Sequence, residues 1–358
     1  MKKIKNYSII LFFAFADNLF SQQETYLTHF QFNKVLYNSA YSGLSNQFCI
    51  SSNSHQQWRG YTDRTLEFNP ESVEGAKLDQ FNTGAQTNLL TINSPLPLNF
   101  GAGLVVMKDV LGYEKNTHLK LLLSKKFELK NNSILSFGFD VNRLQKGLEG
   151  KMLKPLAPND PLVPNNYVTD QHLMFGSSVF YMNPFINHTK TKNLWMGLSV
   201  SNLNEREFVF INSKSEQVTF SKTKQHWYLM SGITFLDLFS NPDIVWKPAL
   251  MIKRNTVTQF ELSNSLEIKN QFTVGNLYRT SDDAMSFFIG YKFLTNNLKG
   301  LRIGYAYDIT LSRIRLVSSG SHELQLNYCF DISHICVIKP FNLIHTPRFL
   351  NTKVFQID

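Results

Sequence analysis

The chain has 358 residues, of which 43% are hydrophobic and 18% charged, and its formal net charge is +9 at pH 7. After the first 21 residues, every apolar stretch is soon interrupted by polar residues, so none reaches the roughly 20 residues of a membrane-spanning helix. An α-helical membrane protein is therefore excluded. The basic residues are dispersed, which argues against nucleic acid as a partner and favours anionic lipids or acidic proteins.

The first 21 residues have the layout of a secretory signal peptide. Three lysines precede the apolar run 9–16, and the small residue Ser21 follows it. An apolar core this short does not span a bilayer as a helix. We therefore predict a signal peptide at 1–21, cleaved near Ser21, and export from the cytoplasm.

Between residues 47 and 330, apolar and polar residues alternate in a succession of short segments, the pattern of a strand with one apolar and one polar face. In 301–309, for example, the apolar residues at every second position lie on one face, and Arg302, Gly304, Ala306 and Asp308 lie on the other. The pattern predicts about fourteen strands, at 48–54, 87–93, 100–107, 118–125, 135–142, 173–181, 194–201, 227–235, 244–252, 260–268, 272–278, 285–293, 301–309 and 323–330.

The connections between these segments are of two kinds. Residues 131–132, Asn270 and residues 282–283 predict tight turns, whereas 145–171 and 202–223 are long and polar. Short turns at one end, long loops at the other and an even number of strands are typical of bacterial outer-membrane barrels. The sequence therefore predicts an all-β fold, a transmembrane antiparallel β-barrel over 47–330 in the outer membrane.

Both ends of an even-stranded barrel lie on one side, which is the side of the short turns. We therefore expect a periplasmic N-terminal segment at 22–46 and a periplasmic C-terminal tail at 331–358. A large soluble β-sandwich would show the same alternation, with its apolar faces turned inward. Small and polar residues opposite each apolar row favour the barrel.

No motif of catalytic chemistry is visible. The chain has no GxSxG and no HExxH, and its three cysteines match no zinc spacing, so we predict no catalytic, cofactor-binding or metal-binding residues. Cys329 and Cys336 are the only cysteines close in sequence, but a strand and its exit need not bring two sulfurs together. The neighbours His322 and Glu323 point to opposite faces of a strand, which argues against an acid/base pair.

Charged residues on the polar faces predict either a pore lining or a structural network that plugs the barrel. The candidates are Arg302, Asp308, Asp140 and Glu261, and Glu323 is expected near Arg302. A barrel of fourteen strands is intermediate in size between filled eight-stranded barrels and open sixteen-stranded porins, so its size does not decide between a pore and a plugged interior. The four tryptophans are expected near strand ends, in an interfacial belt.

Several stretches of the chain resemble the PorP/SprF family in that family's order. The first is HFQFNKVLYNSAYSG, which ends at Gly43 and resembles the family's amino-terminal element, although Lys34 and Ser39 depart from the pattern. Further matching stretches are 57–60 (QWRG), 94–96 (SPL), 101–112 (GAGLVVMKDVLG), 160–161 (DP), 193–205, 305–308, 320–323 (GSHE) and 347–349 (PRF).

This resemblance implies a non-enzymatic outer-membrane component of type IX secretion and gliding in the Bacteroidetes. Its implied partners, besides outer-membrane lipids, are periplasmic secretion components or a secreted adhesin, with no cofactor and no small-molecule substrate. A passive channel or substrate transporter is the alternative, and an enzyme inside the barrel is a third hypothesis without residues to support it.

The resemblance also suggests which residues form a periplasmic docking surface. These partner-binding candidates are Phe32, Asn33, Tyr37, Asn38, Ala40, Tyr41, Gly43, Pro347, Arg348 and Phe349. After 330 the alternation stops, yet the tail stays rich in apolar residues, and its two prolines block a regular strand or helix. The tail either takes part in this docking surface or folds back to fill the mouth of its own barrel.

Overall fold

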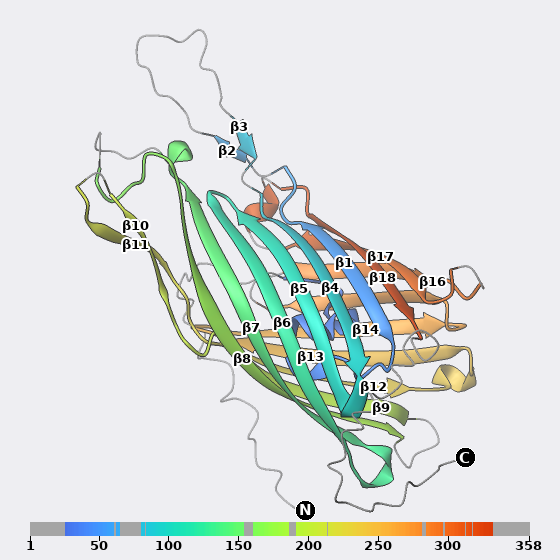
Figure 1. The fold of residues 1–358 in the computed structure, drawn as a ribbon. Helices are drawn as coiled ribbons and strands as arrows, with labels where there is room; N and C mark the ends of the chain where they lie inside the picture. Colours follow the sequence, from blue (N-terminus) through green and yellow to red (C-terminus); the bar gives the residue numbers. More distant parts are fainter. Residues whose placement is uncertain are drawn as a thin grey trace, which may run out of the picture.

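Fourteen antiparallel strands close on themselves to form a barrel (Figure 1). The structure is a computed structural model and describes residues 26–60, 62–64, 80–82, 84–153, 160–185, 191–212, 214–280, 284–295, 298–311, 313–316 and 318–331. The predicted signal peptide at 1–21 and all but the first residue of the predicted tail at 331–358 lie outside these ranges. No helix of the described residues is long and apolar enough to cross a membrane.

The barrel wall confirms the predicted strands one by one. It consists of β1 (Phe48–Gln56), β4 (Gln86–Leu96), β5 (Phe100–Leu111), β6 (Glu114–Glu128), β7 (Ile134–Glu149), β8 (Tyr167–Phe185), β9 (Thr191–Ser201), β12 (His226–Phe235), β13 (Ile244–Arg254), β14 (Thr258–Ile268), β15 (Phe272–Arg279), β16 (Ala284–Lys292), β17 (Leu301–Thr310) and β18 (Ser321–Phe330). Neighbours along the chain pair with each other, and β1 pairs with both β4 and β18, which closes the ring.

The two predicted long loops are partly β-structure. Strands β7 and β8 stay paired as far as Glu149 and Tyr167, so the polar stretch after 145 continues the strands beyond their apolar part. The second loop contains the hairpin β10 (Glu207–Ile211) and β11 (Gln217–Lys222). Polar residues on both faces concealed these extensions in the sequence, because alternation is read from apolar positions.

The two ends of the barrel differ. We call the end where β1 begins and β18 ends the terminal mouth. It carries the short turns η3 (Pro97–Asn99), η4 (Lys130–Asn132) and η6 (Leu238–Ser240). The opposite end, the loop mouth, carries the β10–β11 hairpin, the small sheet of β2 (Thr62–Arg64) and β3 (Gln80–Asn82), and the turns η5 (Gly150–Met152) and η7 (Arg313–Leu316). The long loops thus lie at one end as predicted, but short turns occur at both ends, since residues 112–113 and 255–257 connect strands at the loop mouth. The predicted turn at 282–283 lies outside the described residues.

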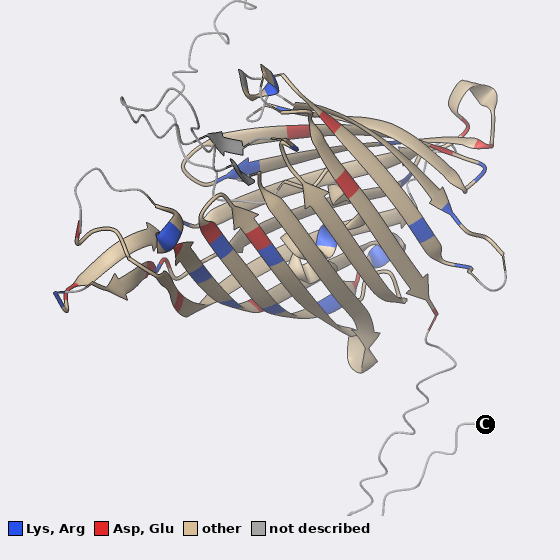
Figure 2. Cartoon of the chain, turned by 90° about the horizontal axis from the view of Figure 1, so that it is seen from above, with Lys and Arg blue, Asp and Glu red and all other residues tan. Residues whose placement is uncertain are grey.

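The outer face of the wall is apolar. Leu121, Leu173 and Ile289 are exposed by 61%, 56% and 61%, although they are large hydrophobic residues. Along β17, exposed Ile303, Tyr305 and Ile309 alternate with residues that face the lumen, as predicted. In Figure 2 most of the wall carries no charge colour, and the charged bands are scattered. A belt of exposed apolar side chains is stable in lipid and unfavourable in water.

Replacing Leu121 by arginine tests this outer face. Leu121 lies between the exposed Leu119 and Leu123 on β6, so the charge would sit within the apolar belt. We expect the free energy of unfolding in lipid vesicles to fall by about 2–4 kcal/mol. Thr117→Arg, also outward-facing but beyond these leucines, is the matched control and should cost much less. Equal losses in the two variants would contradict the assigned depth.

The lumen is filled by residues 26–47, which we call the plug (Figure 1, blue). The plug consists of short turns of helix, η1 (Phe30–Phe32), α1 (Lys34–Tyr37) and η2 (Ser39–Tyr41), separated by Asn33 and Asn38. Asparagine favours such positions because its amide competes with the helical hydrogen bonds. Most plug side chains are buried, including Leu27, Phe30 and Ala40 at 0% exposure.

The position of the plug corrects one sequence-based expectation. Residues 22–46 were expected to form a periplasmic segment, but the described part of that segment lies inside the barrel. The physical reason is that the plug carries the apolar side chains that the lumen needs for a core. Phe30, Tyr37 and Leu44 pack against wall residues such as Phe180 and Met251.

A disulfide bond joins the first and last strands of the barrel. Cys49 on β1 is paired in register with Cys329 on β18, and their sulfur atoms are bonded. The sequence spacing points only to the nearby pair of Cys329 and Cys336, because a bond across 280 residues follows from the closing of the ring and not from spacing. Cys336 lies outside the described residues.

Candidate functional site

The contact between the plug and the wall is the candidate functional site, and Glu323 of β18 is its first anchor. The backbone N–H of Thr28 donates to Glu323 Oε2 over 2.6 Å. The Nδ1 atom of His29 lies 2.9 Å from Oε1, and Asn53 of β1 donates to the same oxygen over 2.9 Å. His29 and Glu323 are both buried, so this carboxylate holds the start of the plug against the seam of β1 and β18.

Asp308 of β17 is a second anchor in the same half of the lumen. It accepts a hydrogen bond from the hydroxyl of Thr28 over 2.8 Å. Its other oxygen lies 3.5 Å from Nε2 of His55 and 3.9 Å from Nη1 of Arg279. Two neighbouring plug residues, Thr28 and His29, are therefore held by carboxylates from two adjacent strands.

A third carboxylate, Glu261 of β14, lies between two cations. Its Oε1 atom is 2.9 Å from Nζ of Lys253 and 3.3 Å from Nε of Arg279. Both cations lie against the ring of Tyr26, at 4.9 Å and 4.8 Å from its centroid. Tyr26 also accepts a hydrogen bond from Gln259 over 2.7 Å. Buried charges of this kind are tolerated only when they are paired, and loss of one partner typically costs about 3–5 kcal/mol.

On the opposite side of the barrel, neutral hydrogen bonds hold the plug. The amide of Asn38 donates to the carbonyl oxygens of Val179 and Leu198, over 3.1 Å and 3.3 Å. The backbone N–H of Ala40 donates to the hydroxyl of Ser178 over 2.8 Å, and Ser39 contacts the same hydroxyl at 2.7 Å. Strands β8 and β9 thus bind the plug through its backbone and its asparagine.

Glycines in the wall let the plug backbone approach closely. A Cβ atom at Gly138 of β7 would lie 2.2 Å from the backbone nitrogen of Ala40. A Cβ atom at Gly101 of β5 would lie 2.1 Å from the carbonyl oxygen of Ser42. Real Cβ atoms do not approach backbone so closely, so both positions require glycine for steric reasons as long as the plug is in place.

The predicted docking residues of the plug lie inside the lumen. Asn33, Tyr37, Asn38, Ala40 and Gly43 are buried in the lumen, and the remaining two, Phe32 and Tyr41, are partly buried. Asn33, for example, is hydrogen-bonded to wall residues of β1 and β4. The other predicted members, Pro347, Arg348 and Phe349, lie outside the described residues, so their role stays a prediction.

The predicted lumen charges do not form a single network. Asp308 and Glu261 belong to the anchors above, whereas Asp140 lies 3.7 Å from Lys120 elsewhere in the lumen. The expected proximity of Glu323 and Arg302 is wrong, because β18 places Asn327 opposite Arg302. Arg302 instead stacks on the ring of Phe32, with its Cζ atom 3.2 Å from the centroid.

Two side-chain orientations predicted from the sequence have clear outcomes. His322 and Glu323 do point to opposite faces, since His322 is bonded to the outward-facing Tyr305 at 2.7 Å while Glu323 is buried. The interfacial position expected for Trp195 is wrong. Its ring stacks on the buried Phe180 inside the lumen, with the centroids 6.0 Å apart.

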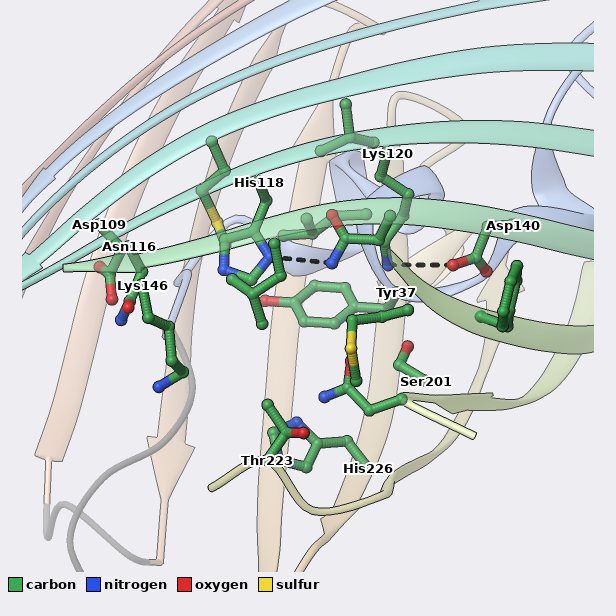
Figure 3. Close-up of a pocket in the computed structure, with 18 of the residues that line it drawn as sticks. Tyr37, Asp109, Asn116, His118, Lys120, Asp140, Lys146, Ser201, Thr223 and His226 are labelled. Carbon is green, nitrogen blue, oxygen red and sulfur yellow. Dashed lines mark hydrogen bonds and ion pairs between the residues drawn. The ribbon is translucent and has the colours of Figure 1, made fainter. Parts of the chain in front are cut away.

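A cavity of about 100 Å³, lined by both polar and apolar side chains, lies between the plug and the loop mouth. Figure 3 shows Tyr37 of the plug at its centre, surrounded by His118, Lys120 and His226. The side chain of Asn142 contacts His118 at 3.1 Å. Among the described residues, no group of three or more His, Cys, Asp or Glu side chains is arranged to hold a metal ion.

Sequence reasoning missed four of the anchoring residues: His29, His55, Lys253 and Arg279. His29 belongs to the plug and the other three face the lumen from the wall, where a single charged residue in a strand gives no local signal of its partner. Their partners come from other strands or from the plug, and these pairings follow from the closed ring rather than from spacing. The one available signal was the occurrence of charges at inward positions of several predicted strands.

A comparison with protein families decides what kind of barrel this is. The family described as type IX secretion system membrane protein PorP/SprF matches residues 19–328, which include the plug and nearly the whole wall. The chain belongs to the PorP/SprF family. It is therefore an outer-membrane component of type IX secretion, and the resemblance noted in the sequence is confirmed.

Solved structures resemble this PorP/SprF barrel in fold alone. A FadL homologue of Pseudomonas aeruginosa has 11% identity and a TM-score of 0.42, covering 80% of this chain and 89% of that one. The toluene transporter TodX of Pseudomonas putida has 10% identity and a TM-score of 0.43, covering 82% and 91%. The CymD monoaromatic hydrocarbon channel has 9% identity and a TM-score of 0.44, covering 79% and 88%. No curated protein matches the chain.

Proposed function

We propose that this PorP/SprF protein is a closed, non-conducting and non-enzymatic barrel that supports type IX secretion or gliding by protein contact. The observation that carries the proposal is the plug. It occupies the lumen and is fixed to opposite sides of the wall, by Glu323 and Asp308 on one side and by Ser178 on the other. A transporter would need a path past this segment, whereas a contact protein needs only a rigid, correctly placed surface.

The proposed contact surface is the terminal mouth. In bacterial barrels the long loops face outward and the opposite mouth faces the periplasm, and the terminal mouth of this barrel lies opposite its long loops. The plug residues of the predicted docking surface support this mouth from inside. The tail that contains Pro347, Arg348 and Phe349 continues from Asp331, at the end of β18. Periplasmic components of the apparatus, or an adhesin passing through it, are the proposed partners.

Truncation after Ile338 tests the contact role, because it removes Pro347, Arg348 and Phe349 and leaves every wall strand intact. We expect the shortened protein to keep the heat-modifiable electrophoretic mobility of a closed barrel while periplasmic partners no longer co-purify. The full-length chain with alanine at these three positions is the matched control for the length of the tail, and it should lose the partners too. Partners retained by a destabilised barrel would mean that the tail only fills its own mouth.

The passive channel remains the second candidate, favoured by the cavity between the plug and the loop mouth, whose lining includes Asp109, Lys120, Asp140 and Lys146. Planar-bilayer recordings distinguish the two functions. We expect the full chain to be silent, and a stable large conductance would reject the closed-barrel proposal. Normal secretion and normal surface adhesins in a gene deletion would reject the contact role.

A further inference from the structure

A second cavity, of about 410 Å³, lies at the terminal mouth between the plug and the wall. Pockets of this size are typical of small-molecule sites. Three cationic side chains line it: Lys34 from the plug, Lys247 from β13 and Arg302 from β17. None of the described residues that line it is acidic. Its other lining residues include the apolar or aromatic Phe32, Tyr41, Leu44, Phe180, Met182, Trp195, Ile233 and Pro248.

The positive charge of this cavity is only partly neutralised. Lys247 forms an ion pair with Glu267, with Nζ and Oε2 2.7 Å apart. The Nη2 atom of Arg302 is buried without a hydrogen-bond partner. Lys34 stands over the ring of Trp195, 4.6 Å from its centroid. Burial, and then repulsion by Lys247 and Arg302, lowers the pKa of Lys34 to about 7. An anion would relieve this repulsion.

The cavity meets the wall where the strand pairing is interrupted. Strands β12 and β13 are paired at Gly232 and Ala249 and again at Phe235 and Trp246, but not between them. On its other side, β12 shifts register against β9 at the same level. The residues at which β12 and β13 are not paired with each other line the cavity: Ile233, Thr234, Lys247 and Pro248. Pro248 has no N–H to donate to the ladder, which weakens this part of the wall.

We propose that this cavity binds an anionic lipid, whose phosphate lies among Lys34, Lys247 and Arg302 and whose acyl chain leaves toward the bilayer at the β12–β13 interruption. Arginine and lysine are the usual phosphate ligands in proteins. The aromatic and aliphatic lining suits an acyl chain, which distinguishes a lipid from an acidic peptide entering through the mouth. The inference does not depend on the proposed secretion role.

Native mass spectrometry of the full-length protein in detergent tests the proposal. The protein is incubated with phosphatidylglycerol, with phosphatidylcholine or with inorganic phosphate. We expect one phosphatidylglycerol to stay bound, phosphatidylcholine to be released and phosphate alone to bind at least about tenfold more weakly. The double variant K34Q/R302Q should bind phosphatidylglycerol at least about tenfold more weakly, because it loses two charged donors. Lys126→Gln is the matched control and should leave lipid binding unchanged, because this half-buried cation near the same mouth donates to Asn46 and does not line the cavity.

Other outcomes overturn the proposal. Equal retention of both lipids, or equal losses in K34Q/R302Q and K126Q, would mean ordinary annular lipid. Inorganic phosphate binding as tightly as the lipid would indicate a free phosphate site. Displacement of bound phosphatidylglycerol by an acidic peptide added to the same sample would indicate a protein ligand. The heat-modifiable mobility of each variant shows that the barrel has assembled.

The wild-type protein offers a second measurement that needs no variant. The titratable and charged groups around Lys34 are Lys247 and Arg302, the Glu267 paired with Lys247, and Tyr41 of the plug. As the pH rises above about 7, unliganded Lys34 loses its proton. The affinity for phosphatidylglycerol should therefore fall with rising pH, while that for phosphatidylcholine stays constant. Affinity for phosphatidylglycerol that does not change with pH would contradict the role of Lys34.

Discussion

Replacing Gly138 by alanine is expected to displace the plug and turn a silent barrel into a conducting one. The added Cβ atom would lie 2.2 Å from the nitrogen of Ala40 and 2.5 Å from the carbonyl carbon of Ser39. Both are backbone atoms, so no side-chain rotation removes the clash. The loss of packing should also lower the free energy of unfolding by about 1–3 kcal/mol. Planar-bilayer recording measures the conductance, and heat-modifiable mobility shows that the wall is closed.

Gly290→Ala is the matched control. Gly290 is also a glycine of the wall, but its added Cβ would come no closer than 3.3 Å to any atom, and that atom belongs to the flexible side chain of Arg302. This variant should stay silent. If Gly138→Ala were silent too, with unchanged stability, the close contact between β7 and the plug would be wrong.

Replacing Glu261 by glutamine is expected to destabilise the barrel more than any other single change in the lumen. Lys253 and Arg279 are exposed by only 3% and 1%, and both are ion-paired with Glu261. Without its charge, two buried cations share one fewer carboxylate. We expect a loss of about 3–5 kcal/mol in the free energy of unfolding, measured with denaturant in lipid vesicles.

The double variant K253M/E261M is the control for this prediction. It removes one charge of each sign, so Arg279 keeps Asp308 as its partner, 3.9 Å away. Apolar replacement of a whole buried pair is often close to neutral, so most of the loss should be recovered. A double variant as unstable as Glu261→Gln would mean that packing around Glu261, rather than its charge, stabilises the wall.

The wall of this barrel could be predicted from the sequence, because lipid on one side and lumen on the other impose a period of two on each strand. The alternation around Ile303, Tyr305 and Asp308 thus gave both the strand and its faces. The ends of β7 and β8 could not be found in this way, since they extend beyond the apolar belt into a region where both faces are polar.

The plug and its anchors could not be placed from the sequence. Residues 30–43 were recognised as a family element, but nothing in their pattern says whether they lie inside or outside a barrel. Glu323 bonds to Thr28, which is 295 residues away. Contacts over such separations depend on the closed ring, whose register only the complete fold defines.

The disulfide has a topological consequence. Along the chain, β1 is the first strand of the wall and β18 is the last. They are neighbours in the barrel, but no loop connects them directly. The bond between Cys49 and Cys329 connects these two strands covalently and closes the chain between them into a covalent ring. A protease that cuts the β10–β11 hairpin would leave one species on a non-reducing gel and two fragments after reduction. The barrel can therefore be nicked at its loop mouth without any strand being released from the wall.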